Sequence, residues 1–383
     1  MLRKTRIAII GAGLGGMTAA AFLQREGFDV SIYEQASAFS RVGAGIILSP
    51  NVAKVLAALD LEDMLVAAGI KADCYISRAW DTGEVLYRID FDAAAEERFG
   101  GAYLNVHRGD LHGILDRSLR PKTVKFDHKL LFIEEGKDAL RLGFENGAHV
   151  EVDIVIGADG LNSKVRESLF GAEPLRFFKA AALRTIFPTS ALNGFAIPDC
   201  TKWWGPDRHA LPYFLTSRRD EIYIIGIIPW SRWDDDVSFL PSSPAFFRES
   251  FADFHDDFQK VIQAPTDVTL WPIFDRPRND TWTKGHIALL GDACHPVPPY
   301  MGAGGAMAIE DAVVLSRCLA SYDAVDEAFD VYQRVRVDRV GHVQRISWEN
   351  SWMRGPTETD WLYCYNPCTA PLVAPEGPRS THV

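Results

Sequence analysis

A glycine-rich string near the N-terminus carries the clearest chemical signal in this 383-residue sequence. It contains Gly11, Gly13, Leu14 and Gly16 in the pattern G-x-G-x-x-G, and the acidic residue Glu34 follows it. The first glycine permits a tight turn, the second lets the backbone approach a pyrophosphate, and the third allows a helix to pack closely on a strand. A carboxylate at Glu34 can accept hydrogen bonds from a ribose. These residues predict the binding of a dinucleotide with a free 2'-hydroxyl, FAD or NAD rather than NADP.

The predicted strands and helix on either side of the glycine-rich string hold it in position. The apolar run 7–10 predicts a buried strand, 17–24 predicts a helix and 30–33 a second strand, which together make a βαβ unit. The N-terminus of such a helix directs its backbone N–H groups and its positive dipole end at the ligand. A further amphipathic helix is predicted over 51–69.

Three further polar motifs follow in order: Arg108, Asp159-Gly160 and Gly291-Asp292. Taken singly, each has an ordinary explanation, because Asp-Gly and Gly-Asp pairs are common in turns and a lone arginine is usually a solvated surface charge. Apolar segments that predict buried strands precede both acidic motifs, at 150–156 and 287–290. The three motifs together are far more specific than any one of them, and they indicate a discontinuous nucleotide-binding domain.

On these motifs the sequence resembles the group A flavoprotein monooxygenases, the family of the salicylate, p-hydroxybenzoate and 6-hydroxynicotinate hydroxylases, over most of the chain. The resemblance implies non-covalently bound FAD, with Asp292 on the flavin ribose and Arg108 in contact with FAD. It also implies that Asp159 touches both the flavin and the reduced nicotinamide. Segment 41–51 resembles the loop that passes the flavin ring in these enzymes, so we expect Arg41 to follow a mobile isoalloxazine.

A glycine-rich segment after the third motif, 302–305, leads into a predicted helix. Its first residues, including Gly304, are expected to direct amides at the pyrimidine edge of the flavin and to stabilise negative charge on the reduced ring. The sequence has no second G-x-G-x-x-G, and the resemblance implies that NADH or NADPH docks transiently as a co-substrate. It also implies hydroxylation by O2 through a C4a-hydroperoxyflavin. The choice between NADH and NADPH stays open.

The aromatic-rich segment 202–214 resembles the substrate strand of the 6-hydroxynicotinate enzymes, with His209 and Tyr213 at matching places. Tyr213 is the first candidate to hydrogen-bond the substrate oxygen, because a phenol can relay a proton while its ring walls the pocket. A buried structural tyrosine is the alternative. His209 and Tyr300 are the other catalytic candidates.

Ile47, Pro298 and Tyr300 complete the expected substrate pocket with Tyr213. The 6-hydroxynicotinate enzymes carry histidines at the positions of Ile47 and Tyr300, so we expect a less basic pocket here. A related hydroxylated aromatic or pyridine acid is therefore expected rather than 6-hydroxynicotinate itself. Arg184 is a candidate to bind a carboxylate, with a solvated arginine as the alternative. The sequence leaves open whether hydroxylation is accompanied by decarboxylation.

Other functions of the same fold have to be weighed. A flavin-dependent halogenase or a reductase would share the fold, but the halogenase signature W-x-W-x-I-P is not evident around Trp203-Trp204 or in 271–273. A non-catalytic FAD-binding redox protein would retain flavin without consuming O2. Complete flavin motifs beside an aromatic pocket favour a catalytic monooxygenase.

We therefore expect an α/β fold: a Rossmann-like FAD-binding domain of the p-hydroxybenzoate hydroxylase type with an inserted mixed β-sheet substrate domain and C-terminal helices. Short aromatic-rich strand patterns mark the inserted sheet. The expected parts are the FAD-binding domain (1–74, 100–176 and 280–320), the substrate domain (75–99 and 177–279) and a C-terminal helical segment with an irregular tail (321–383).

Composition excludes several partners. The formal net charge of -11 disfavours nucleic acid and anionic membranes, and the absence of a long apolar stretch predicts a soluble protein without a membrane span. The six scattered cysteines predict reduced thiols and a cytoplasmic location, and we expect no metal site. A small aromatic or heteroaromatic substrate remains as the expected ligand. The long C-terminal helical segment is compatible with a monomer or a homodimer.

Overall fold

The glycine-rich string follows the first strand of a six-stranded sheet in the computed structural model, which describes residues 5–41, 44–233 and 237–373. The strand order is β19-β20-β12-β1-β2-β8, and neighbouring strands are parallel except for β19 and β20. The predicted βαβ unit is confirmed, because β1 pairs with β2 and α1 connects them. The elements are β1 (Arg6–Ile10), α1 (Leu14–Arg25), β2 (Asp29–Tyr33), β8 (Val124–Lys125), β12 (Ile154–Gly157), β19 (Thr283–Lys284) and β20 (Ile287–Leu289).

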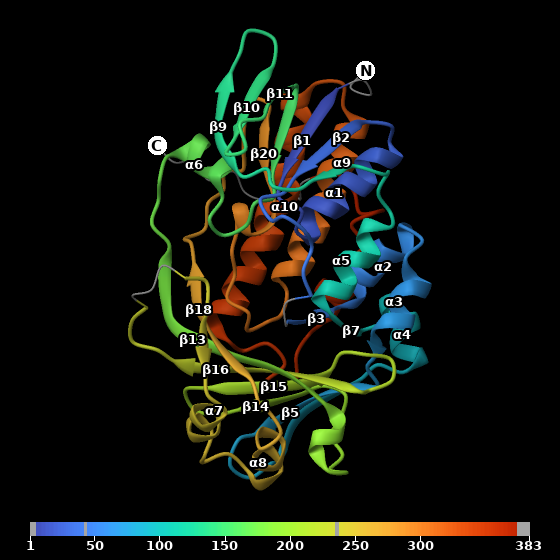
Figure 1. Ribbon diagram of the computed structural model, residues 1–383. Helices are drawn as coiled ribbons and strands as arrows, with labels where there is room; N and C mark the ends of the chain where they lie inside the picture. The colour runs from blue at the N-terminus through green and yellow to red at the C-terminus, as the bar shows by residue number, and fades with distance from the viewer. Residues whose placement is uncertain (1–4, 42–43, 234–236, 374–383) are drawn as a thin grey trace, which may run out of the picture.

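A second sheet, with eight strands in the described part of the chain, lies at the opposite end of the molecule (Figure 1). Its order is β17-β18-β13-β16-β15-β14-β5-β6, and only the pair β14 and β5 is parallel. It is the expected mixed sheet. The strands are β5 (Cys74–Ala79), β6 (Val85–Asp90), β13 (Arg176–Pro188), β14 (Thr201–Trp204), β15 (His209–Phe214), β16 (Glu221–Pro229), β17 (Leu240–Ser242) and β18 (Val268–Asp275).

Helices α9 (Gly304–Ser321) and α10 (Val325–Glu349) lie between the two sheets, and α9 packs against α1, α2 and α10 (Figure 1). In the described ranges no helix is long and apolar enough to cross a membrane. The remaining helices are α2 (Pro50–Ala58), α3 (Glu62–Ala68), α4 (Ala93–Phe99), α5 (Arg108–Asp116), α6 (Lys164–Phe170), α7 (Pro244–Ser250), α8 (Asp256–Ile262), α11 (Asp360–Tyr363) and the 3-10 turns η2 (Thr189–Leu192) and η3 (Gly291–Ala293). Two small sheets consist of β3 (Gly45–Leu48), β7 (Leu104–His107) and β4 (Ile70–Lys71), and of β11 (His149–Val152), β10 (Leu140–Phe144) and β9 (Leu130–Glu135).

The eight-stranded sheet has two different faces, because side chains alternate along each strand. Its outer face, which includes Trp203, Ala210 and Ile224, packs against phenylalanines of α7 and α8. Residues one position along each strand form the inner face. This face meets the rest of the molecule, since Tyr213 lies against Gly45 and Lys202 donates to the carbonyl of Tyr300.

Two elements differ from the sequence-based expectation. The helix predicted over 51–69 is two helices, α2 and α3, because Asp60 between them has a positive φ of 61°. The strand predicted over 150–156 is also two, β11 and β12. It divides at Asp153, where the chain changes its pairing partner from β10 to β1 and the carboxylate binds Arg6 at 2.7 Å. The expected domain division stays a proposal.

Candidate active site

A cavity of about 730 Å³ opens beside the ends of β1 and β12. Such a volume suits a ligand much larger than a single ring. All of the predicted cofactor residues except Gly16 and Arg41 line it, although they come from six separate places in the chain. Those that line it are Gly11, Gly13, Leu14, Glu34, Arg108, Asp159, Asp292 and Gly304.

The glycines of the string have different roles. Gly11 has a φ of +100°, and a Cβ there would lie 2.5 Å from the carbonyl oxygen of Ala158. Gly16 lies outside the cavity, where a Cβ would be 2.1 Å from the carbonyl oxygen of Gly11, so its role is helix-strand packing. Gly13 lies on the cavity wall with free space around its Cα, since a Cβ would meet only one atom, at 4.0 Å. This geometry leaves room for a phosphate at the start of α1.

Glu34, which directly follows β2, contacts the glycine-rich string. Its carboxylate accepts hydrogen bonds from the backbone N–H groups of Ala12 and Ala36, both at 2.8 Å, and it lines the cavity. These bonds fix the carboxylate in place while lone pairs remain for ribose hydroxyls. The geometry therefore fits the adenosine end of FAD.

Asp159 holds the turn between β12 and α6. Its carboxylate accepts from the Ser163 hydroxyl at 2.5 Å and from the backbone N–H groups of Lys164 and Val165 at 2.7 and 3.1 Å. Burial raises the pKa of Asp159, and these hydrogen bonds oppose the rise. Most of its acceptor capacity is used within the turn, so it shapes the cavity wall more than it offers a free charge.

Asp292 and Arg108 are two oppositely charged side chains that open into the cavity. Burial raises the pKa of the Asp292 carboxyl, opposed by His295 and Arg108, and burial lowers the pKa of Arg108. Both side chains are exposed to the cavity, where a ligand with polar groups can pair with them. Ribitol hydroxyls and phosphates of FAD supply such partners, so these residues fit the cofactor.

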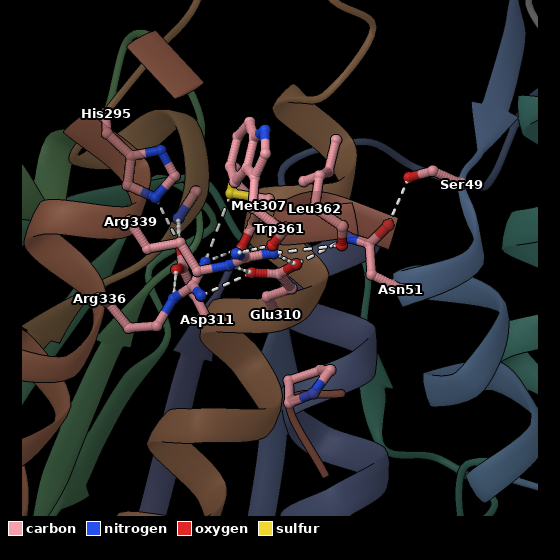
Figure 2. A network of polar contacts seen from close by, with 12 residues as sticks. Ser49, Asn51, His295, Met307, Glu310, Asp311, Arg336, Arg339, Trp361 and Leu362 are labelled. Atoms are coloured by element: carbon pink, nitrogen blue, oxygen red, sulfur yellow. Dashed lines mark hydrogen bonds and ion pairs between the residues drawn. The ribbon is translucent and has the colours of Figure 1, made fainter. Parts of the chain in front are cut away.

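A buried polar network supports the Gly291-Asp292 turn (Figure 2). Asp311, on α9, accepts from the Gly291 N–H at 3.0 Å and contacts Nε2 of His295 at 2.5 Å. Arg336, on α10, donates to Asp311 at 2.7 Å. Burial by itself would raise the pKa of Asp311, but the charges of His295 and Arg336 lower it to about 2. The turn that presents Asp292 is thus anchored to two helices.

The same network reaches the segment that follows β3 (Figure 2). Arg336 also donates to Glu310 at 2.6 Å, and Arg339 donates to both oxygens of Glu310 at 2.8 Å. Asn51, at the start of α2, donates to Glu310 at 2.7 Å. The network therefore joins the Gly291-Asp292 turn, α9 and α10 to the start of α2.

Cys294, His295 and Asp311 lie close enough together to suggest a metal site, with candidate ligand atoms within 4.8 Å of one another. Asp311 is already bonded to Gly291 and Arg336, and burial raises the pKa of Cys294 far above that of an ordinary thiol. A protonated thiol is a poor ligand. We assign these residues to the polar network rather than to a metal.

The candidate catalytic residues lie on or against the inner face of the eight-stranded sheet. His209 and Tyr213 are on β15, and the ring of Tyr300 meets that of His209 edge-on with centroids 5.1 Å apart. Tyr213 places its hydroxyl against Gly45, and Ile47 shares that side of β3 by alternation. Pro298 is buried in the loop between η3 and α9.

Arg41 is not brought to the cavity. Its guanidinium forms ion pairs with Asp110 at 3.0 Å and with Glu221 at 2.8 Å. Arg41 therefore links α5 to β16 of the eight-stranded sheet. Its neighbours Val42 and Gly43, part of the expected flavin loop, lie outside the described residues. Ile46, rather than Ile47, lines the cavity.

Sequence reasoning missed two groups of residues. His128 and Lys129 line the cavity near Glu34 but follow a two-residue strand that has no recognisable motif. Lys202 lies on the inner face of the sheet, buried beside His209. Its only sequence signal is a lysine inside an aromatic strand.

Known protein families and curated proteins resemble this chain. The sequence matches the family described as "FAD binding domain" over residues 4–347. The chain belongs to this FAD-binding family. It is 44% identical to 6-hydroxynicotinate 3-monooxygenase of Bordetella bronchiseptica, covering 99% of the chain and 100% of that protein. It is 35% identical to 3-amino-4-hydroxybenzoate 2-monooxygenase of Streptomyces cremeus, covering 90% of the chain and 86% of that protein.

Solved structures of FAD-binding proteins agree with the fold. Klebsiella pneumoniae HpxO, complexed with FAD and uric acid, superposes with a TM-score of 0.79 at 26% identity, covering 90% of this chain and 87% of that one. A salicylate hydroxylase substrate complex gives a TM-score of 0.81 at 21% identity, covering 96% and 97%. At that identity the second likeness concerns the fold alone.

The family and its curated relatives make this chain an FAD-dependent aromatic monooxygenase that uses NAD(P)H and O2. The cavity residues described above would hold FAD, which would supply the redox chemistry with NAD(P)H and O2. The halogenase, reductase and non-catalytic alternatives are set aside by these relatives.

Proposed function

We propose that the substrate is a single hydroxylated benzene or pyridine ring that carries a carboxylate, and that it binds between the inner face of the eight-stranded sheet and the flavin. The observation that carries this proposal is the inner face itself, which presents polar and aromatic side chains opposite β3 and the loop of Tyr300. The names of the curated relatives support the same class, since 6-hydroxynicotinate, 3-amino-4-hydroxybenzoate and 3-hydroxybenzoate are all ring hydroxy acids.

Tyr213 is proposed to donate a hydrogen bond to the substrate oxygen. It is 3% exposed, and burial raises its pKa well above that of an ordinary phenol, so it stays protonated at neutral pH. A protonated phenol stabilises an ionised ring oxygen, which raises the electron density of the ring. Gly45 holds the hydroxyl in position, because no side chain at 45 competes for that space.

His209 is proposed to assist at the same ring. Burial lowers its pKa strongly, and the nearby charge of Lys202 lowers it further, so the imidazole is neutral. Its Nδ1 lies 3.4 Å from Nδ2 of Asn350, a donor, which assigns the proton to Nε2. A neutral imidazole in this tautomer can donate to the substrate and orient it.

Tyr300 and Ile47 are proposed to set the choice among substrates. Burial raises the pKa of Tyr300 to about 12, so it acts as a neutral wall against His209 and Phe178. Ile47 makes the opposite wall apolar. Compared with a pocket containing imidazoles at both places, this one offers fewer proton acceptors. We therefore place 6-hydroxynicotinate in the test panel and expect a related ring acid to be preferred.

The same proposal covers the nicotinamide co-substrate, the location in the cell and the oligomeric state. We propose that NADH or NADPH docks transiently, since the described residues contain one glycine-rich dinucleotide cavity, which FAD occupies. A cytoplasmic location, as a monomer or homodimer, fits the free thiols.

The test is NAD(P)H oxidation by the purified yellow protein with hydroxybenzoates, hydroxynicotinates and their decarboxylated counterparts, each with NADH and with NADPH. Hydroxylated product, hydrogen peroxide and CO2 are assayed together. Oxidation stimulated by a ring acid, with product matching NAD(P)H consumed, is expected. Stimulation by neutral rings only, or oxidation that yields peroxide alone with every ring acid, would contradict the proposed substrate class.

A further inference from the structure

Lys202 is a buried lysine in the proposed substrate region. It is 2% exposed and lies on the inner face of β14. Its Nζ donates to the carbonyl oxygen of Tyr300 at 3.0 Å and lies 3.7 Å from the ring centroid of Trp204. Both contacts hold the ammonium between the sheet and the Tyr300 loop.

No carboxylate pairs with Lys202 among residues 5–41, 44–233 and 237–373. The charged group that acts on it most clearly is Arg354, a second cation, whose guanidinium lies 5.6 Å from the other contact of Lys202, the Trp204 ring. Buried lysines are normally compensated by a negative charge, because desolvation strongly penalises an isolated ammonium. Burial lowers the pKa of Lys202 well below that of an ordinary lysine, and an anion bound at this wall would compensate the ammonium form.

The strand register places Lys202 next to the candidate catalytic residues. Cys200 lies opposite Tyr213 and Trp204 lies opposite His209, so Lys202 lies opposite Leu211, midway between the two catalytic candidates. From strand spacing and rise, the Cα atoms of Lys202 and Tyr213 are roughly 8 Å apart. One aromatic ring can thus reach both side chains.

We propose that the Lys202 ammonium binds the carboxylate of the substrate while Tyr213 contacts the ring hydroxyl. This inference rests on the proposed function and adds to it the group that selects acids over neutral rings. The carboxylate takes the place of the missing counter-ion, and the Tyr300 carbonyl and Trp204 ring orient the ammonium toward it. The ring is thereby fixed at both ends against the inner face.

Arg184 is the competing cation on this face. Its guanidinium stacks on Trp271 at 4.7 Å, and its Nε is buried without a hydrogen-bond partner in the described residues. It lies opposite Ile225, two strands from Tyr213, which gives a Cα separation of roughly 12 Å. Its charge also acts on Arg108 at the flavin cavity. The charge of Arg184 acts on Tyr213 as well. By Cα separation, Lys202 is the nearer of the two cations to Tyr213, so both are compared in the experiment.

The experiment measures dissociation constants by perturbation of the flavin spectrum of the holoenzyme. The ligands are two matched pairs, 6-hydroxynicotinate with 2-hydroxypyridine and 4-hydroxybenzoate with phenol. Wild type is compared with Lys202→Met, with Arg184→Met, and with Lys260→Met, a lysine on α8 behind the opposite face of the sheet. Lys202→Met is expected to weaken binding of the acids roughly 10- to 100-fold and of the neutral rings by less than about threefold. Lys260→Met is expected to change neither.

Equal weakening of acids and neutral rings by Lys202→Met, or a selective loss of acids in Arg184→Met instead, would overturn the assignment. Flavin content and the unfolding midpoint are measured for each variant, and if Lys202→Met fails to retain FAD, Lys202→Gln is judged by the same criterion. A wild-type enzyme that prefers the neutral rings would instead contradict the proposed substrate class. The two failures are therefore distinguishable.

Discussion

The hydroxyl of Tyr213 rests on the Cα of Gly45, so closely that a Cβ at position 45 would lie 2.6 Å from the phenolic oxygen. The ring cannot move aside freely, because it is buried and meets Tyr223 edge-on with centroids 5.3 Å apart. β3, which carries Gly45, and β15 of the eight-stranded sheet thus together fix the position of the Tyr213 hydroxyl. Small changes at this contact should act on hydroxylation before they act on FAD binding.

Gly45→Ala tests this contact. The added methyl group should displace the Tyr213 hydroxyl by a few tenths of an ångström or more, and a displacement of this kind can cost roughly 100-fold in rate. We expect FAD content near that of wild type, a lower yield of hydroxylated product and more hydrogen peroxide per NAD(P)H. Gly113→Ala, at an exposed position of α5 with open space around it and no positive φ, serves as the control. Unchanged product yield in Gly45→Ala would show that the hydroxyl position is not critical.

Tyr213→Phe removes the hydroxyl and keeps the ring. Because the aromatic body still fills the site, we expect FAD retention and a normal unfolding midpoint, with a rate of hydroxylation lower by roughly 100-fold or more. The matched control is Tyr223→Phe, the neighbouring buried tyrosine on β16. Equal turnover in Tyr213→Phe and wild type would remove Tyr213 from the catalytic group.

Asp292→Ala should release FAD. The carboxylate faces the cavity, and losing one charge-assisted hydrogen bond to the ribose should weaken FAD binding by roughly 10- to 100-fold. The measurement is flavin absorbance per protein after gel filtration, with the dissociation constant from fluorescence. Asp153→Ala, which breaks the ion pair with Arg6 away from the cavity, is the control. Full flavin occupancy in Asp292→Ala would contradict the assignment of this motif.

Arg336→Met should destabilise the fold. It would leave Glu310 and Asp311 buried with less positive charge, and breaking a buried pair in this way costs about 3–5 kcal/mol. Urea unfolding measures the free energy of unfolding. Arg334, two residues before Arg336, forms an exposed ion pair with Asp330. Arg334→Met removes this pair and should lower the free energy of unfolding by less than about 1 kcal/mol. A similar small cost for both variants would mean that the network contributes little to stability.

His112 should make stability depend on mild acid. Burial, and secondarily the charge of Arg108, lowers the pKa of His112 to about 4, whereas in the unfolded chain it titrates near 6.5. The unfolded state therefore binds more protons between these values, so the stability from the neutral imidazole is complete above about pH 6.5 and is lost as the pH falls toward 4. The loss amounts to at most about 3 kcal/mol.

The measurement for His112 is the free energy of unfolding at pH 7.5 and pH 5. The decrease should be smaller in His112→Gln than in wild type, while His149→Gln, at an exposed imidazole, should follow wild type. An identical decrease in all three proteins would assign the pH dependence to other groups.

Local patterns in the sequence were sufficient to locate the cofactor motifs. Gly11, Gly16 and Glu34 act within one βαβ unit, where turn sterics and the alternation of strand and helix restrict the structure strongly. Asp159 and Asp292 each follow a buried strand, and parallel strands of one sheet bring their carboxyl ends to the same edge. For this reason the resemblance to the flavin hydroxylases and the fold class could be predicted, and most of the predicted cofactor residues line the cavity.

Tertiary structure decided what depends on contacts between distant segments. Whether Arg41 reaches the flavin cavity depends on Asp110 and Glu221, which bind it elsewhere. Lys202 is buried without a paired carboxylate in the described residues because of the register of β14 with β15 and the position of the Tyr300 loop. Neither of these leaves a signal in the local sequence pattern. Sequence spacing specifies which face of an element a side chain takes. It does not specify which remote side chains neutralise its charge, because that depends on how the elements pack.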